Sequence, residues 1–317
     1  MSERAARFCP RRYSCDGRRP GGRRKLGGIG PPCVRKATFF REDPMLIAAL
    51  QTVSTPRVEE NLDHARRLIA RAAEAGARLV GLPEYFCLMG HSDRDKLAHA
   101  EAPGDGPIQA MLSEAARTHG LWVIGGTLPM RVPGAGGERA LNASCVYGPD
   151  GALAARYDKM HLFRYDNGRE NFDEGRVLDA GSEPVTFSAD GLRVGLSICY
   201  DLRFPELYRA MMSPPCDLLA VPAAFTHTTG RAHWELLLRA RAVENQCYVI
   251  APAQGGLHEN GRRTFGHSLI ADPWGEVIAM QEEGEGVVLA TLDPARIAQV
   301  RMQLPALTHR QARWMVS

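Results

Sequence analysis

One cysteine, Cys199, occupies the position in this chain where a side chain is best placed for covalent chemistry. Residues 192–198 form an apolar run that predicts a buried strand, and residues 200–206 predict a turn that leads into a helix. The last side chain of such a strand faces the N-terminus of the next helix, where backbone N–H groups favour negative charge. A thiol in this setting can act as a nucleophile, although a free cysteine often simply packs in a core.

The other cysteines outside the N-terminal region lack this setting. Cys145 and Cys247 lie inside apolar runs, whereas Cys87 and Cys216 lie in predicted loops, so we interpret all four as structural. The chain has eight cysteines without the paired C-x2-C spacing of structural zinc sites. This usage favours a reduced, cytoplasmic protein without a metal.

Charged residues follow two further predicted strands. Glu84 comes shortly after the apolar run 79–82, and Lys159 follows the second strand of a predicted hairpin. Because loops at strand ends assemble sites from residues distant in sequence, an acid, an amine and a thiol could meet there. A thiol needs a base, and a carbonyl under attack needs a positive group for its oxyanion. The lysine should also lower the pKa of the thiol, and Asp201 should oppose this effect if it points inward.

Apolar periodicity predicts that strands and helices alternate from residue 45 onwards, which favours one α/β domain with helices covering mixed sheets. The predicted strands cover residues 46–50, 79–82, 121–124, 192–198, 218–221, 247–251 and 287–292. Turn signals predict hairpins that join 141–147 to 152–157 and 268–272 to 276–280. The predicted helices cover residues 58–75, 108–116, 232–244 and 294–302.

Charge is distributed unevenly along the 317 residues. Residues 1–44 contain 12 basic and 4 acidic residues, a net charge of +8, and many prolines and glycines, so we expect a disordered basic extension. Residues 45–317 contain 27 basic and 32 acidic residues, a net charge of −5, without a basic stripe for nucleic acid. We therefore expect no nucleic-acid partner. No run approaches the roughly 20 apolar residues that cross a bilayer, so we expect no membrane partner either.

Three separated motifs together resemble the Glu-Lys-Cys signature of the nitrilase superfamily of carbon–nitrogen hydrolases. They occur in the same order and with similar spacing, and the resemblance covers about residues 45 to 310. The motifs are Gly81-Leu82-Pro83-Glu84, Tyr157-Asp158-Lys159-Met160-His161-Leu162-Phe163 and Ser197-Ile198-Cys199-Tyr200-Asp201-Leu202-Arg203-Phe204-Pro205-Glu206.

The resemblance implies a four-layer αββα sandwich, with two mixed sheets flanked by helices, over residues 45–317. It implies a homodimer or higher homo-oligomer and no metal or organic cofactor. Position by position, it makes Glu84 the general base, Lys159 the oxyanion stabiliser and Cys199 the nucleophile, with the backbone N–H of Tyr200 completing the oxyanion hole. Family members often use a second glutamate after the lysine, for which Glu174 is our candidate and Glu170 its rival.

The segment around the cysteine is similar to the branch that contains deaminated-glutathione amidase and ω-amidase. This likeness implies hydrolysis of a small anionic amide through a thioester, with the first of these reactions favoured and the second as the alternative. An anionic substrate needs local cations in a body with a net negative charge. We therefore expect Arg203 and Arg164, which follow the cysteine and the lysine closely, to bind substrate.

Two other classes of protein remain open at the level of the sequence. A papain-like cysteine protease would pair Cys199 with a histidine, for which His161, His233 and His267 are available. A binding module could keep the fold without the chemistry, although the complete acid, amine and thiol set argues against this alternative.

Overall fold

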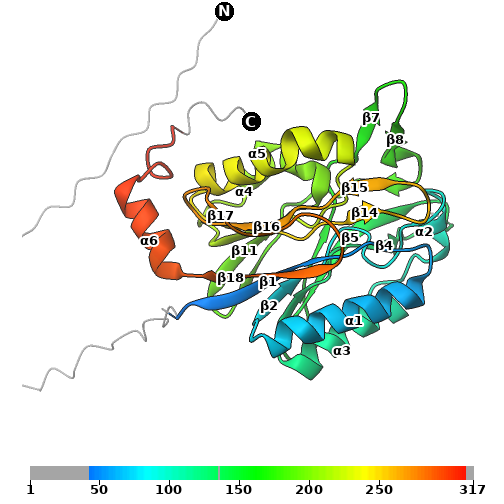
Figure 1. The fold of residues 1–317 in the computed structure, drawn as a ribbon, viewed down its shortest axis with the longest axis horizontal. Coiled ribbons are helices and arrows are strands. Elements are labelled where there is room, and N and C mark those ends of the chain that lie inside the picture. Colours follow the sequence, from blue (N-terminus) through cyan, green and yellow to red (C-terminus); the bar gives the residue numbers. More distant parts are fainter. Residues whose placement is uncertain (1–42, 135, 312–317) are drawn as a thin grey trace, which may run out of the picture. The chain divides into compact units, whose positions relative to one another are not determined.

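The computed structural model describes residues 43–134 and 136–311. In these ranges, strands and helices alternate along the chain as the periodicity predicts (Figure 1). The expected disordered extension, residues 1–44, lies outside the described residues except for its last two positions. No helix within the described ranges combines the length and the apolar character needed to cross a membrane.

The first sheet is mixed and has eight strands. Its three central strands, β1, β2 and β3, run parallel, whereas β18 and β5 pair with them in antiparallel fashion on the two sides. The strands are β18 (Gly286–Leu292), β1 (Met45–Gln51), β2 (Leu79–Gly81), β3 (Trp122–Ile124), β5 (Ala140–Tyr147), β4 (Leu128–Arg131), β6 (Leu153–Asp158) and β9 (Leu178–Asp179).

The second sheet is also mixed, with six strands. Here β11, β12 and β13 are parallel, and the flanking pairs are antiparallel. The strands are β10 (Thr186–Ala189), β11 (Leu192–Leu196), β12 (Leu218–Ala220), β13 (Tyr248–Ala251), β16 (Ser268–Ala271) and β17 (Val277–Gln281).

Side-chain alternation along β1 explains how the layers stack. Ile47 and Ala49 join the apolar cluster that includes the second sheet, whereas Ala48 and Leu50 face the cluster formed with the outer helices. The helices α1 (Val58–Glu74) and α3 (Pro107–His119) cover that outer face, and α4 (Pro205–Ala210) and α5 (His227–Asn245) cover the second sheet (Figure 1). The order is helices, sheet, sheet and helices, and the αββα sandwich is confirmed.

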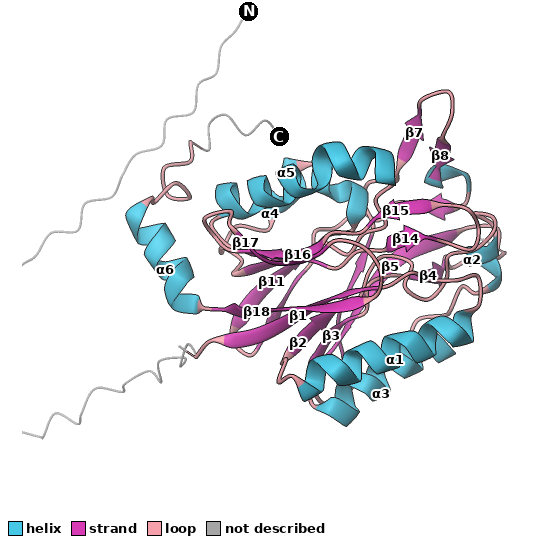
Figure 2. Cartoon of the chain, in the orientation of Figure 1, coloured by secondary structure: helices cyan, strands magenta, loops and turns pink. Residues whose placement is uncertain are grey.

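Several short elements complete the described chain (Figure 2). Two of them are small hairpins, in which β7 pairs with β8 and β14 pairs with β15. The short elements are α2 (Asp95–Ala98), β7 (Arg164–Asp166), β8 (Asn171–Asp173), the 3₁₀ helices η1 (Glu174–Arg176) and η2 (Cys199–Arg203), β14 (Gly255–Leu257), β15 (Arg263–Phe265) and α6 (Pro294–Gln303).

Helix α5 begins at His227, five residues before the predicted start at residue 232. The reason is a local cap, because the Thr226 side chain accepts a hydrogen bond from the backbone N–H of Thr229 at 3.2 Å. Apolar periodicity does not detect such a start, since the first turn carries few apolar side chains. The extra turn places Thr226 and Thr229 beside Cys199, where both line a cavity.

Candidate active site

Three strand ends bring an acid, an amine and a thiol to the same buried region. Glu84 lies three residues after β2, Lys159 directly follows β6, and Cys199 opens η2 after β11. Their exposed fractions are 1% for Glu84, 0% for Lys159 and 7% for Cys199. Buried charges are stable in proteins only when they are paired and hydrogen-bonded, so the partners of these groups decide what the site can do.

Lys159 lies between two carboxylates. Its Nζ donates to Glu84 Oε1 at 2.8 Å and to Glu174 Oε2 at 2.8 Å. Its backbone is fixed as well, because the Lys159 N–H donates to the carbonyl of Asn142 at 3.0 Å and its carbonyl accepts from Gly181 at 2.8 Å. A side chain on Gly181 would collide with the carbonyl of Asp158, so this close contact requires glycine. The ammonium is therefore held in one position.

The Glu84 carboxylate is oriented from three directions. Besides Lys159, the Asn142 side chain donates to Oε1 at 2.9 Å, and the backbone N–H of Ala224 donates to Oε2 at 2.9 Å. The segment before Glu84 packs closely against Gly126, where a Cβ would lie 2.0 Å from the carbonyl oxygen of Pro83. Gly126 also has a φ of +51°, so both its space and its backbone favour glycine.

The structure brings Glu174, and not Glu170, to the lysine. Glu174 also accepts from the Tyr85 hydroxyl at 2.6 Å and from the backbone N–H of Phe163 at 2.7 Å. Glu170 instead lies near the β7–β8 turn, where Asn167 donates to its carboxylate at 3.3 Å. The sequence alone could not decide which of the two glutamates is the second active-site glutamate, because they are four positions apart in a stretch without clear periodicity.

Electrostatics in this group follow from two carboxylates sharing one ammonium. Burial opposes the charge of Lys159, but Glu174 and Glu84 outweigh it and raise the lysine pKa well above its usual value. Burial likewise opposes the charge of Glu174, and Lys159 together with Lys96 holds the pKa of that carboxyl below its usual value. Lys159 and Glu174 are thus both charged at neutral pH.

The Cys199 thiol is protonated in the resting site. Burial raises its pKa well above the usual value, and the negative charge of Glu84 adds to the rise. Lys159 lowers the pKa as the sequence suggested, but its effect is outweighed. Because the thiol is neutral and the Glu84 carboxylate acts on it, Glu84 can take its proton when the sulfur attacks.

The backbone of Cys199 has an uncommon conformation. Its φ is +49°, in the left-handed region that non-glycine residues rarely adopt, and its N–H donates to the carbonyl of Pro222 at 2.9 Å. Strain of this kind persists where the surrounding structure determines the position. Tyr200, the second residue of η2, has its N–H in the first turn, where such groups have no partner within the helix.

Asp201 fixes the turn that carries the thiol. It accepts hydrogen bonds from the backbone N–H of Ile198 at 2.8 Å and from the Tyr157 hydroxyl at 2.7 Å. On its other oxygen it accepts from the backbone N–H of His161 at 3.0 Å and contacts the ring Nδ1 of the same residue at 2.7 Å. Both carboxylate oxygens of Asp201 are thus engaged by the groups around them.

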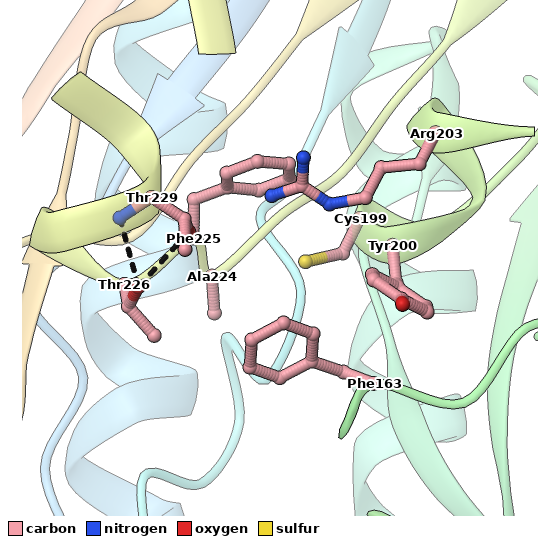
Figure 3. Close-up of a pocket in the computed structure, with 8 residues that line it drawn as sticks. All are labelled: Phe163, Cys199, Tyr200, Arg203, Ala224, Phe225, Thr226 and Thr229. Atoms are coloured by element: carbon pink, nitrogen blue, oxygen red, sulfur yellow. Dashed lines mark hydrogen bonds between the residues drawn. The ribbon is translucent and has the colours of Figure 1, made fainter. Parts of the chain in front are cut away.

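A small cavity opens onto the sulfur (Figure 3). It measures about 10 Å³, roughly the space of one water molecule. Arg203 lies on its wall, with its guanidinium 5.2 Å from the ring centroid of Phe225 and hydrogen-bonded to His233 at 3.2 Å. The residues around the cavity are Phe163, Cys199, Tyr200, Arg203, Ala224, Phe225, Thr226 and Thr229.

Arg164, the second predicted substrate-binding cation, is not among the residues that line this cavity. It is exposed on β7, where its backbone pairs with Asp173 of β8. The prediction rested on its closeness to Lys159 in sequence. The chain enters the β7–β8 hairpin at Arg164, so this residue does not line the space beside the thiol.

The three histidines considered for a protease pair all engage other groups. His161 contacts Asp201, His233 contacts Arg203 at 3.2 Å, and the ring of His267 lies against the ring of Phe265. None of the hydrogen bonds in the described part of the chain joins these rings to Cys199. The geometry thus gives no support to a papain-like pair.

The four other cysteines of the described chain are buried in core positions. Burial raises the pKa of Cys145 to about 12 and that of Cys216 to about 11. No cluster of histidine, cysteine and carboxylate side chains suited to a metal ion occurs in the described ranges. The carboxylates near Cys199 are instead engaged by Lys159.

Three contacts that orient the charged groups were not predicted. The Asn142 side chain holds Glu84, the Ala224 N–H holds its other oxygen, and the Tyr85 hydroxyl holds Glu174. Asn142 sits inside a predicted strand, where an asparagine at a buried position was a signal that sequence reasoning could have used. The Ala224 contact is made by backbone, which no residue type reveals.

The fold agrees with comparisons to known proteins. The family model described as "Carbon-nitrogen hydrolase" matches residues 46–302. A deaminated glutathione amidase of Synechocystis is 43% identical over 84% of this chain and 98% of its own length. The chloroplastic omega-amidase of Arabidopsis thaliana is 40% identical over 84% of this chain and 72% of its own length.

A solved structure shows the same fold. The crystal structure of the NitFhit protein of C. elegans superposes with a TM-score of 0.80 and 36% sequence identity, covering 86% of this chain. The present chain spans 66% of that protein's chain. The resemblance recognised from the three motifs is confirmed by these matches.

Proposed function

Because this chain belongs to the carbon–nitrogen hydrolase family, we propose that it is a cysteine-dependent amidase that acts on deaminated glutathione. The observation that supports the chemistry most directly is the placement of Lys159 between Glu84 and Glu174, beside a protonated Cys199. The Synechocystis relative supports the choice of amide, since it is a deaminated glutathione amidase that matches over 98% of its length.

The reaction begins with proton transfer from sulfur to oxygen. The Glu84 carboxylate takes the thiol proton of Cys199 as the sulfur attacks the amide carbonyl. The protonated Glu84 then gives this proton to the nitrogen as the carbon–nitrogen bond breaks, which leaves a thioester. The leaving amine is the amino group of cysteinylglycine for deaminated glutathione, and it is ammonia for a primary amide.

Water completes the cycle at the thioester. Glu84, again a carboxylate, accepts a proton from the attacking water and returns it to the sulfur as the carbon–sulfur bond breaks. This step regenerates the thiol and releases the carboxylic acid, which loses its proton to solvent. In both steps the negative charge on the carbonyl oxygen is held by the Lys159 ammonium and the Tyr200 N–H. Glu174 keeps Lys159 charged and in position, because among the groups that raise the lysine pKa it makes the largest contribution.

A variant of the nucleophile tests this mechanism. We expect Cys199→Ala to fold, since it only shortens a small buried side chain, and to form no acyl-enzyme. Mass spectrometry of the parent protein mixed with substrate should show a covalent adduct on the peptide that contains Cys199, and the variant should show none. Release of product by the variant at the parental rate would refute the assignment.

A direct comparison of substrates tests the choice of amide. The parent should hydrolyse deaminated glutathione with a higher kcat/KM than 2-oxoglutaramate, the substrate of the ω-amidase reaction. A reversed preference would favour the ω-amidase alternative, to which the Arabidopsis relative lends support. A simple nitrile and an N-carbamoyl amino acid serve as controls for other reactions of this chemistry.

We also propose a homodimer that forms through the helical side of the second sheet, in the cytoplasm. Leu236 and Val243 of α5 are 68% and 48% exposed, and Trp274 of the β16–β17 turn is 55% exposed. Leu236 and Val243 are seven residues apart and therefore share one face of the helix. Sedimentation equilibrium should give twice the chain mass, and the mass of one chain at micromolar concentration would contradict the dimer.

A further inference from the structure

A second and larger cavity adjoins the one that opens onto Cys199. It measures about 520 Å³, compared with about 10 Å³ beside the sulfur, and the two share Ala224 and Thr226 in their walls. The space at the nucleophile fits the reacting amide group at most, so the rest of a substrate has to lie in a neighbouring space. The larger cavity is the adjoining space of sufficient size.

Three arginines line this second cavity, and they differ in how their charge is used. Arg263 pairs with Glu283 at 2.8 Å, and both side chains are about half exposed. Arg169 is exposed in the β7–β8 turn. Arg262 is half-buried, its guanidinium lies 4.9 Å from the ring centroid of Phe172, and it has no carboxylate partner within the described part of the chain.

The segment that carries Arg262 is held firmly. The Arg262 N–H donates to the side chain of Asn260 at 2.9 Å, and its carbonyl accepts from the N–H of His258 at 2.8 Å. Asn260 in turn donates to the carbonyl of Gly90 at 2.6 Å, and the buried His258 ring contacts Thr264 at 2.8 Å. A fixed arginine loses less freedom on binding an anion than a mobile surface arginine.

A row of aromatic rings leads from the nucleophile to this arginine. Phe163 lines the cavity at Cys199, its ring lies 5.8 Å from that of Phe172, and the guanidinium of Arg262 lies over the ring of Phe172. The charge of Arg262 also affects the pKa of a residue in the active site. Burial raises the pKa of Tyr85 well above its usual value, and Arg262 opposes that rise.

We propose that the second cavity is a subsite for the far end of an extended amide substrate, and that Arg262 binds a carboxylate there. This inference rests on the proposed function and specifies its substrate class as a peptide-like amide with a second carboxylate beyond the leaving nitrogen. Glu170 also lines the cavity, and its negative charge disfavours an anion close to it. We therefore assign the binding position to the guanidinium of Arg262, which has no carboxylate partner in the described ranges.

The subsite predicts that Arg262 distinguishes long substrates from short ones. In Arg262→Ala the KM for deaminated glutathione should rise about tenfold, the typical effect of losing one charge-assisted hydrogen bond to an anion. The KM for 2-oxoglutaramate should stay within about twofold, because this shorter substrate ends before the second cavity. Arg262→Lys, which keeps the charge but not the planar fork, should give an intermediate KM.

The matched control is Arg263→Ala, which removes the same charge from the next residue. Its KM for both substrates should remain near the parental value, because Glu283 already engages this guanidinium. Equal rises for both substrates in Arg262→Ala, or an equal rise in Arg263→Ala, would overturn the subsite. A parent protein that hydrolyses neither substrate would overturn the proposed function as well, whereas an active parent with an unaffected Arg262→Ala variant would overturn the subsite alone.

Discussion

Two buried groups of polar side chains flank Cys199, and they differ in how completely their charges are satisfied. The first, here the charge cluster, consists of Glu84, Lys159 and Glu174, in which two carboxylates share one ammonium. The second, here the Asp201 network, consists of Tyr157, His161 and Asp201, in which one fully buried carboxylate receives four contacts. Both groups tie the loop after β6 to a neighbouring strand end.

This difference separates chemistry from support. In the charge cluster, the charge of Glu84 raises the pKa of the thiol, so Glu84 is the carboxylate that we expect to receive its proton. In the Asp201 network, the carboxylate accepts from the backbone N–H of Ile198, next to the nucleophile. It also holds the Tyr157 hydroxyl and the backbone and ring of His161, in the segment that carries Lys159. We infer that changes in the charge cluster act on the rate of reaction, whereas changes in the Asp201 network act on the stability of the turn.

The largest effect is expected from Glu84→Gln. This variant keeps the shape of the side chain but removes the base, so kcat should fall by about 100- to 10,000-fold. Folding should survive, because the change removes one of two carboxylates that face a single ammonium. Steady-state kinetics and thermal unfolding of the same preparation measure both effects. A loss of stability equal to that of an Asp201 variant would remove the distinction between the two groups.

The same variant should change the pH at which the thiol reacts. Burial and the nearby Glu84 carboxylate both raise the pKa of Cys199. Removal of the Glu84 charge leaves burial and Glu174, which raise the pKa, and Lys159, which lowers it. The pKa should therefore fall, and alkylation by iodoacetamide should begin at lower pH in Glu84→Gln than in the parent. The pH profile of the alkylation rate measures this shift, and a profile displaced to higher pH would contradict the role given to Glu84.

A smaller effect on rate, with a larger effect on stability, is expected from Asp201→Asn. The amide nitrogen of asparagine cannot accept the hydrogen bonds that one carboxylate oxygen now accepts, so buried donors lose their partner. The cost should be about 1–3 kcal/mol in the free energy of unfolding. Urea unfolding followed by circular dichroism measures this change.

Tyr157→Phe provides the graded control for this network. It removes one donor to Asp201 and leaves the contacts with Ile198 and His161. Its cost should therefore be smaller, about 0.5–1.5 kcal/mol. If Asp201→Asn lowered kcat as strongly as Glu84→Gln without any change in unfolding, the assignment of Asp201 to support would fail.

The sequence predicted the elements that carry strong periodicity. The strands around Leu79 and Leu218 and the helix from Val58 were placed within a few residues, because apolar side chains recur at fixed intervals there. Short strands such as β10 and the β7–β8 hairpin were not predicted. Their side chains are partly exposed, and their pairing depends on chain contacts that no local pattern reports.

The candidate site was predictable to the extent that it is built from charged side chains at strand ends. Glu84 and Lys159 follow apolar runs, so their position relative to the sheets could be inferred. The contact between Lys159 and Glu174 depends on the path of the chain through the β7–β8 hairpin, which also carries Arg164 away from the thiol. A separation in sequence does not determine such a path.

The smallest effect is expected at the outer wall of the Cys199 cavity, where Arg203 is half-buried and engaged with aromatic rings and His233. If its guanidinium binds a substrate carboxylate, Arg203→Ala should raise KM by about tenfold and change kcat little, because the contact is the same in the ground state and the transition state. Arg164→Ala, which removes an exposed arginine that does not line this cavity, is the matched control and should leave KM unchanged. Steady-state kinetics with deaminated glutathione measures both. A fall in kcat without a rise in KM would instead show that Arg203 acts on the rate through the position of Cys199. Arg203 would then belong with the charge cluster and not with the residues that only bind substrate.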